Sequence, residues 1–501
     1  MKYGPVLGNA TLAAFERESL HVNSPGLDIY CMAIGGTGMA PLACLLQEQG
    51  HRVRGTDGPL YPPMSTLLES AGIRPTVGYD PAHLDPRPDL VVIGNAIHRN
   101  NPEAVEAERL GLECVSMPQA LSRFFLAGRR PLVVAGTHGK TTTTAMAAWV
   151  YAQCGRDPGY LIGGAPQDLP VSFRAGTGDR FIVEGDEYNA AYFDRGPKFL
   201  HYRPETLLLT SVEYDHADLY PTPEALHAAY AELLRLLPAD GFLAACGDTP
   251  KVRELATLAR CPVLFYGLEE ENDLHPLGGI EAGIEALPEG SRFRVRDVDA
   301  GGAGGAGEVE ISLRLAGGHN ISNALAVWAA ARRDGLPADQ VAAAFASFRG
   351  VKRRQEELGT GRGITVVDDF AHHPTAVEKT LVALRQRYPG RRLVALFEPR
   401  SLTAGRWFFF DAYREAFGHA DRVLFAPIFH QGRLQDGERL DFAQLSDLLS
   451  AAGVPATVGA DNDDLLRHAL EESRDGDVLV TMSSGSFDGM PHRLIAALRQ
   501  P

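Results

Sequence analysis

The chain has 501 residues, of which 45% are hydrophobic and 22% are charged, and this composition indicates a folded globular protein rather than a disordered one. At roughly 150 residues per domain, the length predicts about three domains. The formal net charge of −15 argues against nucleic-acid binding, because an acidic surface does not attract a phosphate backbone.

Cysteine usage and the lack of long apolar runs predict a cytoplasmic protein. The N-terminus lacks the pattern of a secretory signal, and no apolar run approaches the ~20 residues that span a bilayer. We therefore expect neither membrane nor nucleic acid among its partners. Without CxxC spacing, the six cysteines indicate neither a zinc cluster nor a disulfide framework. They are Cys31, Cys44, Cys114, Cys154, Cys246 and Cys261.

Three successive sets of alternating strands and helices predict an α/β fold with parallel sheets. We expect a Rossmann-like N-terminal domain over residues 1–128, of which residues 1–27 form an extension without clear periodicity. A central domain over residues 129–348 ends in two alternating runs around a Gly/Ala-rich loop, which predicts a small antiparallel hairpin with a long, mobile tip. Residues 349–501 predict a Rossmann-like C-terminal domain.

The central set opens with a candidate phosphate-binding loop, GTHGKTT, between an apolar strand and an Ala-rich helix. Backbone N–H groups and a helix N-terminus would surround an anion there. Lys140 would reach the terminal phosphates, and Thr141 would offer its hydroxyl to Mg²⁺. The usual first glycine of a P-loop is replaced by Val134, which predicts a shorter loop that binds ATP.

Two other strands of the central set end in ionisable residues. Glu184 ends the apolar run of FIVEGDEYN, with Asp186 and Glu187 behind it, and Asp215-His216 follow the strand in LLLTSVEYDH. In open α/β sheets, ligands bind at the carboxyl ends of the strands. Glu184 is therefore the best candidate Mg²⁺ ligand. His216 alone would be as easily structural as a ligand, but convergence of three strand ends on one crevice favours a ligand role.

The first set carries a glycine loop, GGTGM, and Asp57 closes the next strand about 20 residues later, as in a dinucleotide fingerprint. The third glycine of that fingerprint is replaced by Pro41. The pattern predicts a loop that accepts a diphosphate without saying which one.

The third set places Asp368, Asp369, His372 and His373 after a buried strand. Adjacent histidine side chains diverge and no further Cys or His clusters nearby, so we expect polar contacts to a ligand rather than zinc. Just before it, the charged run from Lys352 to Arg354 lies at the inferred hinge. It would clamp phosphate when the last domain closes.

In this order, the motifs GTHGKTTT, EGDEY, YDHAD, HNISNA, KRR and DDFAHHPTA resemble the Mur ligase family, the ATP-dependent amide-forming enzymes of peptidoglycan synthesis. The resemblance extends from about Ile29 to the C-terminus. It implies ATP as co-substrate with two Mg²⁺ ions, and a monomer or weak homodimer.

The resemblance also implies roles for matching residues. Those expected at the chemistry are Lys140, Glu184, His216 and Arg354, with Mg²⁺ on Thr141, Glu184 and His216. The expected ATP-binding residues are Gly136, Thr137, His138, Gly139, Lys140, Thr141, Thr142, Asn320, Asn323, Arg354 and Asp369. Those expected to bind a UDP-sugar are Gly36, Thr37, Gly38, Met39, Asp57 and Asn95. Those expected to bind a peptide are His372, His373, Arg400 and Ser401.

Four stretches, YPPMSTLLE, VVIGNAI, FDRGPKFLHYRPETL and LFEPRS, are most similar to one branch of the family. That branch joins UDP-N-acetylmuramate to the tripeptide L-alanyl-γ-D-glutamyl-meso-diaminopimelate in peptidoglycan recycling. The branch that adds L-alanine is expected to carry a His-Arg pair where this chain has Arg400-Ser401. The difference implies a larger pocket that accepts a peptide. The chain departs from the usual pattern of the tripeptide-adding branch at two places. The loop AIGGTGM looks more like that of the L-alanine branch, and EGDEY stands in place of the usual EADEY.

Four alternatives stay open at this point. L-Alanine addition is the nearest. Folate polyglutamylation is disfavoured by the UDP-type loop of the first domain. A nicotinamide-dependent oxidoreductase would leave the central P-loop without a role, and a non-catalytic nucleotide-binding module would leave Glu184 and His216 unexplained.

Overall fold

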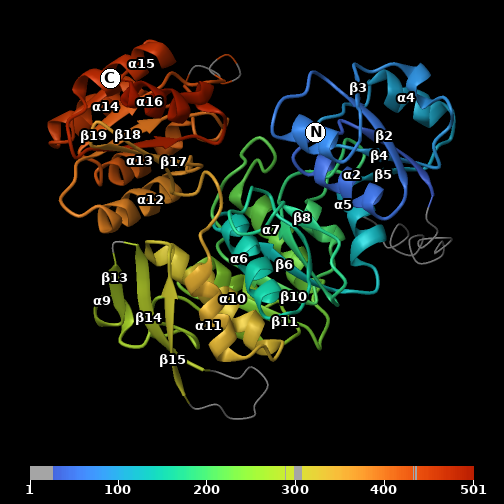
Figure 1. The fold of residues 1–501 in the computed structure, drawn as a ribbon, viewed down its shortest axis with the longest axis horizontal. Helices are drawn as coiled ribbons and strands as arrows, with labels where there is room; N and C mark the ends of the chain where they lie inside the picture. Colours follow the sequence, from blue (N-terminus) through green and yellow to red (C-terminus); the bar gives the residue numbers. More distant parts are fainter. Residues whose placement is uncertain are drawn as a thin grey trace.

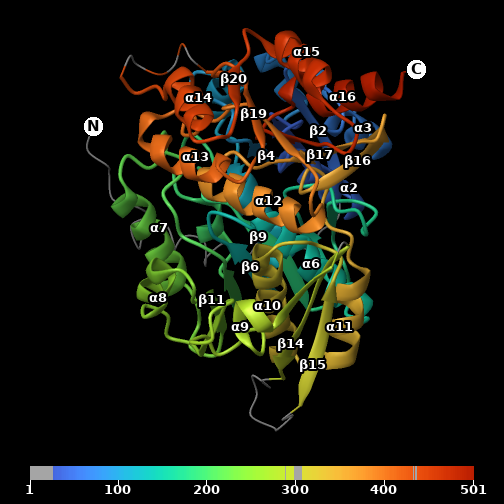
Figure 2. The ribbon, with the colours of Figure 1, turned by 90° about the vertical axis from the view of Figure 1, so that its left-hand side faces the viewer.

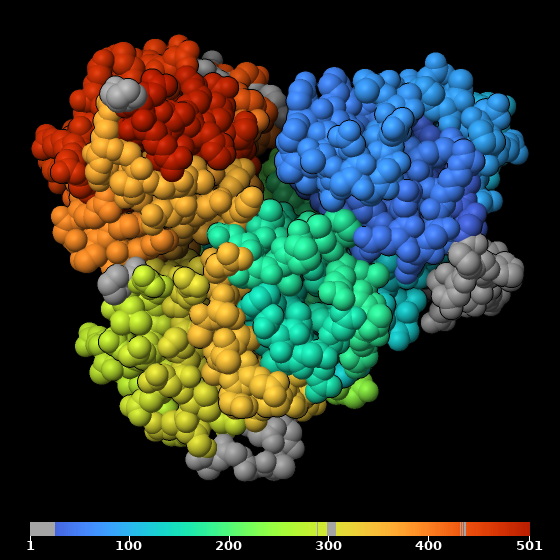
Figure 3. Space-filling model, in the orientation of Figure 1, coloured from blue at the N-terminus to red at the C-terminus, as the bar shows by residue number. Residues whose placement is uncertain are grey.

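The computed structural model describes residues 26–287, 289–297, 307–430, 432, 434 and 437–500. Three parallel sheets, one after another along the chain, form three lobes, and the predicted α/β fold is confirmed (Figure 1). Figure 3 shows a hollow between the blue N-terminal lobe and the orange-red C-terminal lobe, with the central lobe below it. The predicted extension, apart from Gly26 and Leu27, and most of the predicted hairpin tip lie outside the described residues. The domain boundaries near residues 128 and 348 stay predictions.

The N-terminal sheet has the strand order β3-β2-β1-β4-β5, with all neighbouring pairs parallel. Helices cover both of its faces, and after Asp28 the middle strand is buried from Ile29 to Met32. Its strands are β1 (Asp28–Met32), β2 (Arg52–Asp57), β3 (Thr76–Val77), β4 (Leu90–Ile93) and β5 (Cys114–Ser116). Its helices are α2 (Met39–Glu48), α3 (Met64–Ser70), η1 (Pro81–Leu84), α4 (Pro102–Arg109), α5 (Met117–Leu121) and the π-helical turn η2 (Ser122–Leu126).

The central sheet has the order β12-β11-β10-β6-β9-β7-β8, and only the β7–β8 pair is antiparallel. Its middle strand, β6, lies between β9 and β10, and Ala135 at its end pairs with both Gly185 and Leu209. The segments after these three strands therefore leave the sheet side by side. The strands are β6 (Arg130–Ala135), β7 (Gly159–Leu161), β8 (Phe173–Arg174), β9 (Arg180–Gly185), β10 (Thr206–Leu209), β11 (Phe242–Cys246) and β12 (Val263–Tyr266).

A smaller antiparallel sheet, β13-β14-β15, packs beside the central one. The predicted hairpin is β14 with β15, and the sequence did not predict its third strand, β13. These strands are β13 (Ile284–Leu287), β14 (Gly290–Arg296) and β15 (Glu308–Leu313). The helices of the central lobe are α6 (Lys140–Gln153), η3 (Lys198–His201), α7 (Pro223–Arg235), α8 (Pro250–Ala256), α9 (Gly279–Ala282), α10 (Gly318–Arg333) and α11 (Ala338–Ser347).

The C-terminal sheet has the order β16-β17-β21-β18-β19-β20, and β16 is its one antiparallel strand among the described residues. In Figure 2, α12 lies between this sheet and the central lobe. The strands are β16 (Glu356–Gly361), β17 (Ile364–Asp369), β18 (Leu393–Phe397), β19 (Arg422–Phe425), β20 (Ala456–Val458) and β21 (Val478–Met482). The helices are α12 (Pro374–Arg387), η4 (Trp407–Phe409), α13 (Phe410–Phe417), α14 (Phe442–Ala451), α15 (Asn462–Glu472), η6 (Phe487–Gly489) and α16 (Met490–Arg499).

Within the described ranges, no helix combines the length and the apolar character that crossing a bilayer requires.

A buried ion pair ties β9 to the end of α10. The Arg180 guanidinium donates through Nε to Asp334 Oδ2 at 2.6 Å, and their side chains are 3% and 6% exposed. Tyr151 of α6 donates its hydroxyl to the same carboxylate oxygen at 2.6 Å. One carboxylate therefore fixes the packing of two helices against the central sheet.

Replacing Asp334 with Asn is expected to lower the free energy of unfolding of the central lobe by about 3 kcal/mol, because it removes the main counter-charge of the buried Arg180 and leaves the longer contact of 3.4 Å to Glu205. Urea unfolding followed by tryptophan fluorescence measures this, since Trp149 and Trp328 lie on α6 and α10. Asp411→Asn is the matched control, because Asp411 is 80% exposed and pairs only weakly with Arg414. Equal effects of the two substitutions would contradict the prediction.

Candidate active site

The loop between β6 and α6 forms a cradle that only glycine permits at two positions. Gly136 has φ +134°, and a Cβ there would lie 2.2 Å from Thr210 Oγ1. Gly139 has φ +80°, and a Cβ there would lie 2.6 Å from Asn323 Oδ1. The helix begins at Lys140, so its N-terminus points into this cradle, as an anion-binding loop requires.

The side chain of Lys140 turns back into the loop. Its Nζ donates to the carbonyl oxygen of Gly136 at 2.6 Å and to that of Thr137 at 3.3 Å, and it lies 3.0 Å from Glu187 Oε1. Burial opposes the charge, but the carboxylates of Glu187, Asp186 and Glu184 outweigh it and raise the pKa of Lys140 above its usual value. The lysine is therefore a cation held ready beside the loop.

Thr141 and Glu184 meet at the edge of the sheet. Thr141 Oγ1 donates to Glu184 Oε1 at 2.9 Å, and the other carboxylate oxygen accepts from the backbone N–H of Gly163 at 2.9 Å. Burial raises the pKa of Glu184, although Lys140 opposes this. A hydroxyl and a carboxylate in contact form the oxygen-rich ligand set that Mg²⁺ prefers.

Glu187 is the residue whose importance the sequence did not reveal. Its side chain is 2% exposed, and besides Lys140 it contacts His216, whose Nε2 lies 2.9 Å from Glu187 Oε1. Burial lowers the pKa of His216, but the bond to Glu187 and the charge of Asp215 raise it overall. Glu187 follows Glu184 by three residues in EGDE, so the signal was present but was assigned to the other carboxylate.

Residues from α10 and from the C-terminal lobe cover the cradle. Asn323 contacts it at Gly139, and its Nδ2 lies 3.4 Å from Asn320 Oδ1. Arg354 Nη2 donates to Thr141 Oγ1 at 3.5 Å. Asp369 accepts from two backbone N–H groups. Burial raises the pKa of Asp369 overall, although the nearby charge of Arg354 lowers it. The structure thus gathers all the predicted ATP residues around one loop, and their roles stay predictions.

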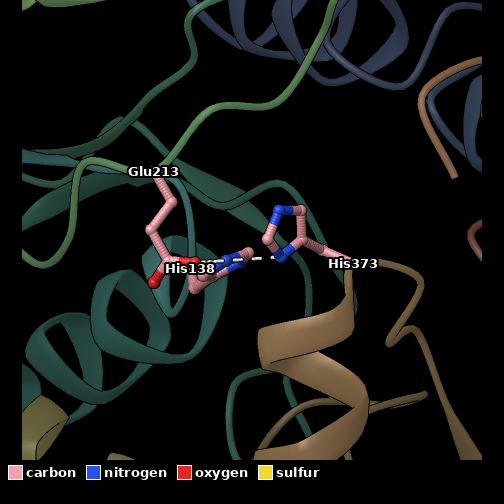
Figure 4. Close-up of side chains that lie close together, drawn as sticks. All are labelled: His138, Glu213 and His373. Carbon is pink, nitrogen blue, oxygen red and sulfur yellow. Dashed lines mark hydrogen bonds and ion pairs between the residues drawn. The ribbon is translucent and has the colours of Figure 1, made fainter. Parts of the chain in front are cut away.

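The two adjacent histidines of the C-terminal lobe diverge, as expected. His372 Nε2 lies 3.8 Å from Asp215 Oδ2, whereas His373 Nδ1 lies 3.8 Å from Glu213 Oε2. No further Cys or His clusters near them in the sequence, but in the fold the rings of His373 and His138 are 4.7 Å apart (Figure 4). The fold brings the two lobes together here, which spacing in the sequence does not show.

Arg400 and Ser401 lie in the loop after β18, away from the nucleotide residues. The Arg400 guanidinium lies over the ring of Phe429 at 3.9 Å, and Nη1 is 3.7 Å from Glu398. Ser401 Oγ accepts from the backbone N–H of Ala404 at 2.9 Å. Further along this loop, the Thr403 hydroxyl accepts from the backbone N–H of Ala217 in the central lobe at 3.2 Å.

The predicted UDP-sugar residues form a separate group in the N-terminal lobe. They follow β1, β2 and β4, at the carboxyl edge of that sheet. Asp57 Oδ2 accepts from the backbone N–H of Gly35 at 2.7 Å, and Oδ1 accepts from Gly58 at 2.7 Å. Asp57 therefore braces the glycine loop, and Asn95 is exposed on the turn after β4. No contact among the described residues joins this group to the P-loop group directly.

Three family descriptions match successive parts of the chain. They are "Mur ligase family, catalytic domain" over residues 28–129, "Mur ligase middle domain" over 134–331, and "Mur ligase, glutamate ligase domain" over 353–485. The chain belongs to the Mur ligase family. Members of this family are ATP-dependent ligases, and so is this protein.

Full-length relatives of this Mur ligase include members with different acceptors. It is 37% identical to the UDP-N-acetylmuramate–L-alanyl-γ-D-glutamyl-meso-2,6-diaminoheptandioate ligase of Escherichia coli K12, over 94% of this chain and 98% of that one. It is 32% identical to the UDP-N-acetylmuramate–L-alanine ligase of Desulfitobacterium hafniense, over 92% and 98%. The crystal structure of a murein peptide ligase from Psychrobacter arcticus matches with a TM-score of 0.68 and 34% identity, over 95% and 99%.

In this Mur ligase, Gly136→Ala is expected to weaken ATP binding by about tenfold or more, because the methyl group would overlap Thr210 and distort the cradle. Isothermal titration calorimetry with a non-hydrolysable ATP analogue measures this. Gly155→Ala is the control, because Gly155 also has positive φ (+72°) but open space around a Cβ. Unchanged affinity in the Gly136 variant would contradict the assignment of this loop.

Proposed function

We propose that this Mur ligase joins UDP-N-acetylmuramate to the tripeptide L-alanyl-γ-D-glutamyl-meso-diaminopimelate at the expense of ATP. The observation that carries the proposal is the match, over 94% of the chain, to a ligase whose name states this acceptor. Arg400 and Ser401, in place of the His-Arg pair expected for L-alanine addition, support it. The second candidate, L-alanine addition, is supported by the relative from Desulfitobacterium hafniense.

The reaction needs activation because a carboxylate has no good leaving group. In the proposed sequence, a carboxylate oxygen of the muramoyl group attacks the γ-phosphorus of ATP, ADP leaves, and an acyl phosphate forms. The free α-amine of the tripeptide then attacks the acyl carbon, inorganic phosphate leaves, and the amine loses a proton. One amide bond forms for each ATP cleaved to ADP and phosphate.

The central residues fit ATP and Mg²⁺. The glycine cradle and the α6 N-terminus suit the phosphates, and Lys140 carries the positive charge that transfer of a phosphoryl group requires. Thr141 and Glu184 would hold one Mg²⁺ ion and His216 a second. When bound, these ions neutralise the crowded phosphate oxygens. Asn320 and Asn323 would contact the adenine, and Asp369 the ribose.

The C-terminal lobe contributes residues to the covering of the cradle. Arg354 reaches Thr141 from the start of this lobe, and Thr375 at the start of α12 donates to Glu213 Oε2 at 2.6 Å. Such contacts keep water from the acyl phosphate, which would otherwise hydrolyse. We further propose that the UDP-sugar lies on the N-terminal lobe and the tripeptide on the C-terminal one, in a cytoplasmic monomer or weak homodimer.

Steady-state assays of ADP release test the acceptor. With UDP-N-acetylmuramate and ATP present, the tripeptide is expected to support turnover with a kcat/KM at least about a hundredfold above that of L-alanine, because a site with buried polar groups rejects a ligand that leaves them unpaired. The ligation product is identified by mass spectrometry. Preference for L-alanine would favour the second candidate, and no ADP release dependent on both substrates would refute the proposal.

Arg400→Ala is expected to raise the KM for the tripeptide about tenfold with little change in kcat, because loss of a charge-assisted hydrogen bond to a peptide carboxylate weakens ground and transition states alike. The residue is well placed for this, since its side chain packs on Gly485 and over Phe429. Arg414→Ala is the control, because Arg414 lies on the surface of α13 and pairs only with Asp411. Equal KM values for the two variants would exclude Arg400 from the peptide site.

A further inference from the structure

A group of three potential metal ligands lies where the C-terminal lobe meets the central lobe. His138 lies in the loop before α6, Glu213 lies in the segment after β10, and His373 is the residue before α12. We call these three residues the interlobe cluster. One ligand atom from each lies within 4.8 Å of the other two. Figure 4 shows His373, at the end of its helix, facing His138 and Glu213.

The distances in the interlobe cluster suit a four-coordinate ion. At the usual bond lengths of zinc, two ligands of a tetrahedral site lie about 3.3 Å apart. His138 Nε2 is 3.4 Å from Glu213 Oε2, and His373 Nδ1 is 3.8 Å from the same oxygen. The third pair, His138 with His373, lies within 4.8 Å, so the histidine side chains would have to move closer together for all three ligands to bind one ion.

Other residues already hold these side chains in place. Thr375 donates its hydroxyl to Glu213 Oε2, and Thr137 Oγ1 is bonded to the backbone carbonyl and N–H of Glu213. The His373 ring packs against Phe409, with 4.7 Å between ring centres. Metal sites depend on such outer contacts to orient their ligands, and the interlobe cluster has them.

Two of the three side chains, His373 and Glu213, are in the protonation state that a metal needs. Burial lowers the pKa of His373 to about 3, so its imidazole is neutral. Its Nδ1 accepts the backbone N–H of Thr375 at 3.3 Å, a weak bond that an ion bound at Nδ1 would replace. Burial opposes ionisation of Glu213, but hydrogen bonds and charge from His138 lower its pKa to about 2. In addition, the Nε2 atom of the buried His373 has no hydrogen-bond partner. The cluster thus has a carboxylate and an imidazole whose bonding capacity is only partly used.

We infer that the interlobe cluster is a binding site for a divalent transition-metal ion of the zinc class, with ligands from both the central and the C-terminal lobe. Two imidazoles and one carboxylate suit zinc or cobalt rather than Mg²⁺, which takes oxygen ligands. Three protein ligands leave the fourth position for water or a ligand oxygen. The site uses none of the Mg²⁺ residues Thr141, Glu184 and His216, and a bound ion would hold the two lobes together.

Cobalt titration of the full-length protein tests this inference. The protein is freed of metal by chelation and titrated with Co²⁺ in excess Mg²⁺, so that oxygen-rich sites are filled, and without nucleotide. We expect one equivalent of Co²⁺ to bind with the intense visible absorption of four-coordinate cobalt, and Zn²⁺ to displace it. No stoichiometric absorption would mean that the cluster is only a hydrogen-bonded contact, and would overturn the inference.

Three variants localise the site. His138→Ala, Glu213→Gln and His373→Asn are each expected to lower cobalt affinity by about tenfold or more, since even outer-shell changes cost 10–100-fold. Asn at position 373 keeps a side-chain acceptor for the Thr375 N–H at the start of α12, so the helix is preserved while the imidazole is lost. His419→Ala is the control, because His419 pairs with Glu378 on the surface without a third ligand.

Circular dichroism and thermal unfolding show that each variant is folded before titration. Undiminished cobalt absorption in His373→Asn, or equal losses in His419→Ala, would place the ion elsewhere and overturn the inference. Neither the cobalt absorption nor the folding measurements depend on ligase activity. The outcome is therefore independent of which acceptor the enzyme uses.

Discussion

The ion pair between the ammonium group of Lys140 and the carboxylate of Glu187 is the interaction around which the central lobe is organised. The side chain of Lys140 is 12% exposed, and taking a charge out of water costs several kcal/mol unless partners compensate. The compensation comes from two loop carbonyls and the Glu187 carboxylate. These partners meet because β6 lies between β9 and β10, so that the loop, the acidic segment and the segment with His216 leave the sheet as neighbours.

Much of this arrangement could be predicted from the sequence. Short apolar runs between helical stretches are enough to indicate parallel α/β sheets, and the carboxyl ends of such strands identify a crevice. The prediction that Thr141 and Glu184 belong together rests on that rule, and their hydroxyl and carboxylate do meet. Ordered motifs over nearly the whole chain then indicated the family, which the comparisons confirm.

Other features depend on contacts that no local pattern contains. Glu187 was placed behind Glu184 without a role of its own, because nothing in EGDE tells which carboxylate turns toward the lysine. His138 and His373 are separated by more than two hundred residues, and their approach depends on how the C-terminal lobe sits on the central one. β13 was missed because its run is short and it forms an edge strand whose pairing partner is the only reason for its extended shape.

The internal partner of Lys140 has a consequence for how the enzyme receives a nucleotide. Because Glu187 already neutralises the ammonium, a phosphate bound at the proposed ATP site would not meet a bare cation but would replace one counterion by another. The gain in binding energy would then be the difference between two ion pairs, so the lysine would contribute to discrimination between anions more than to raw affinity. Glu187 also contacts His216, so such an exchange would alter the surroundings of the histidine as well as those of the lysine.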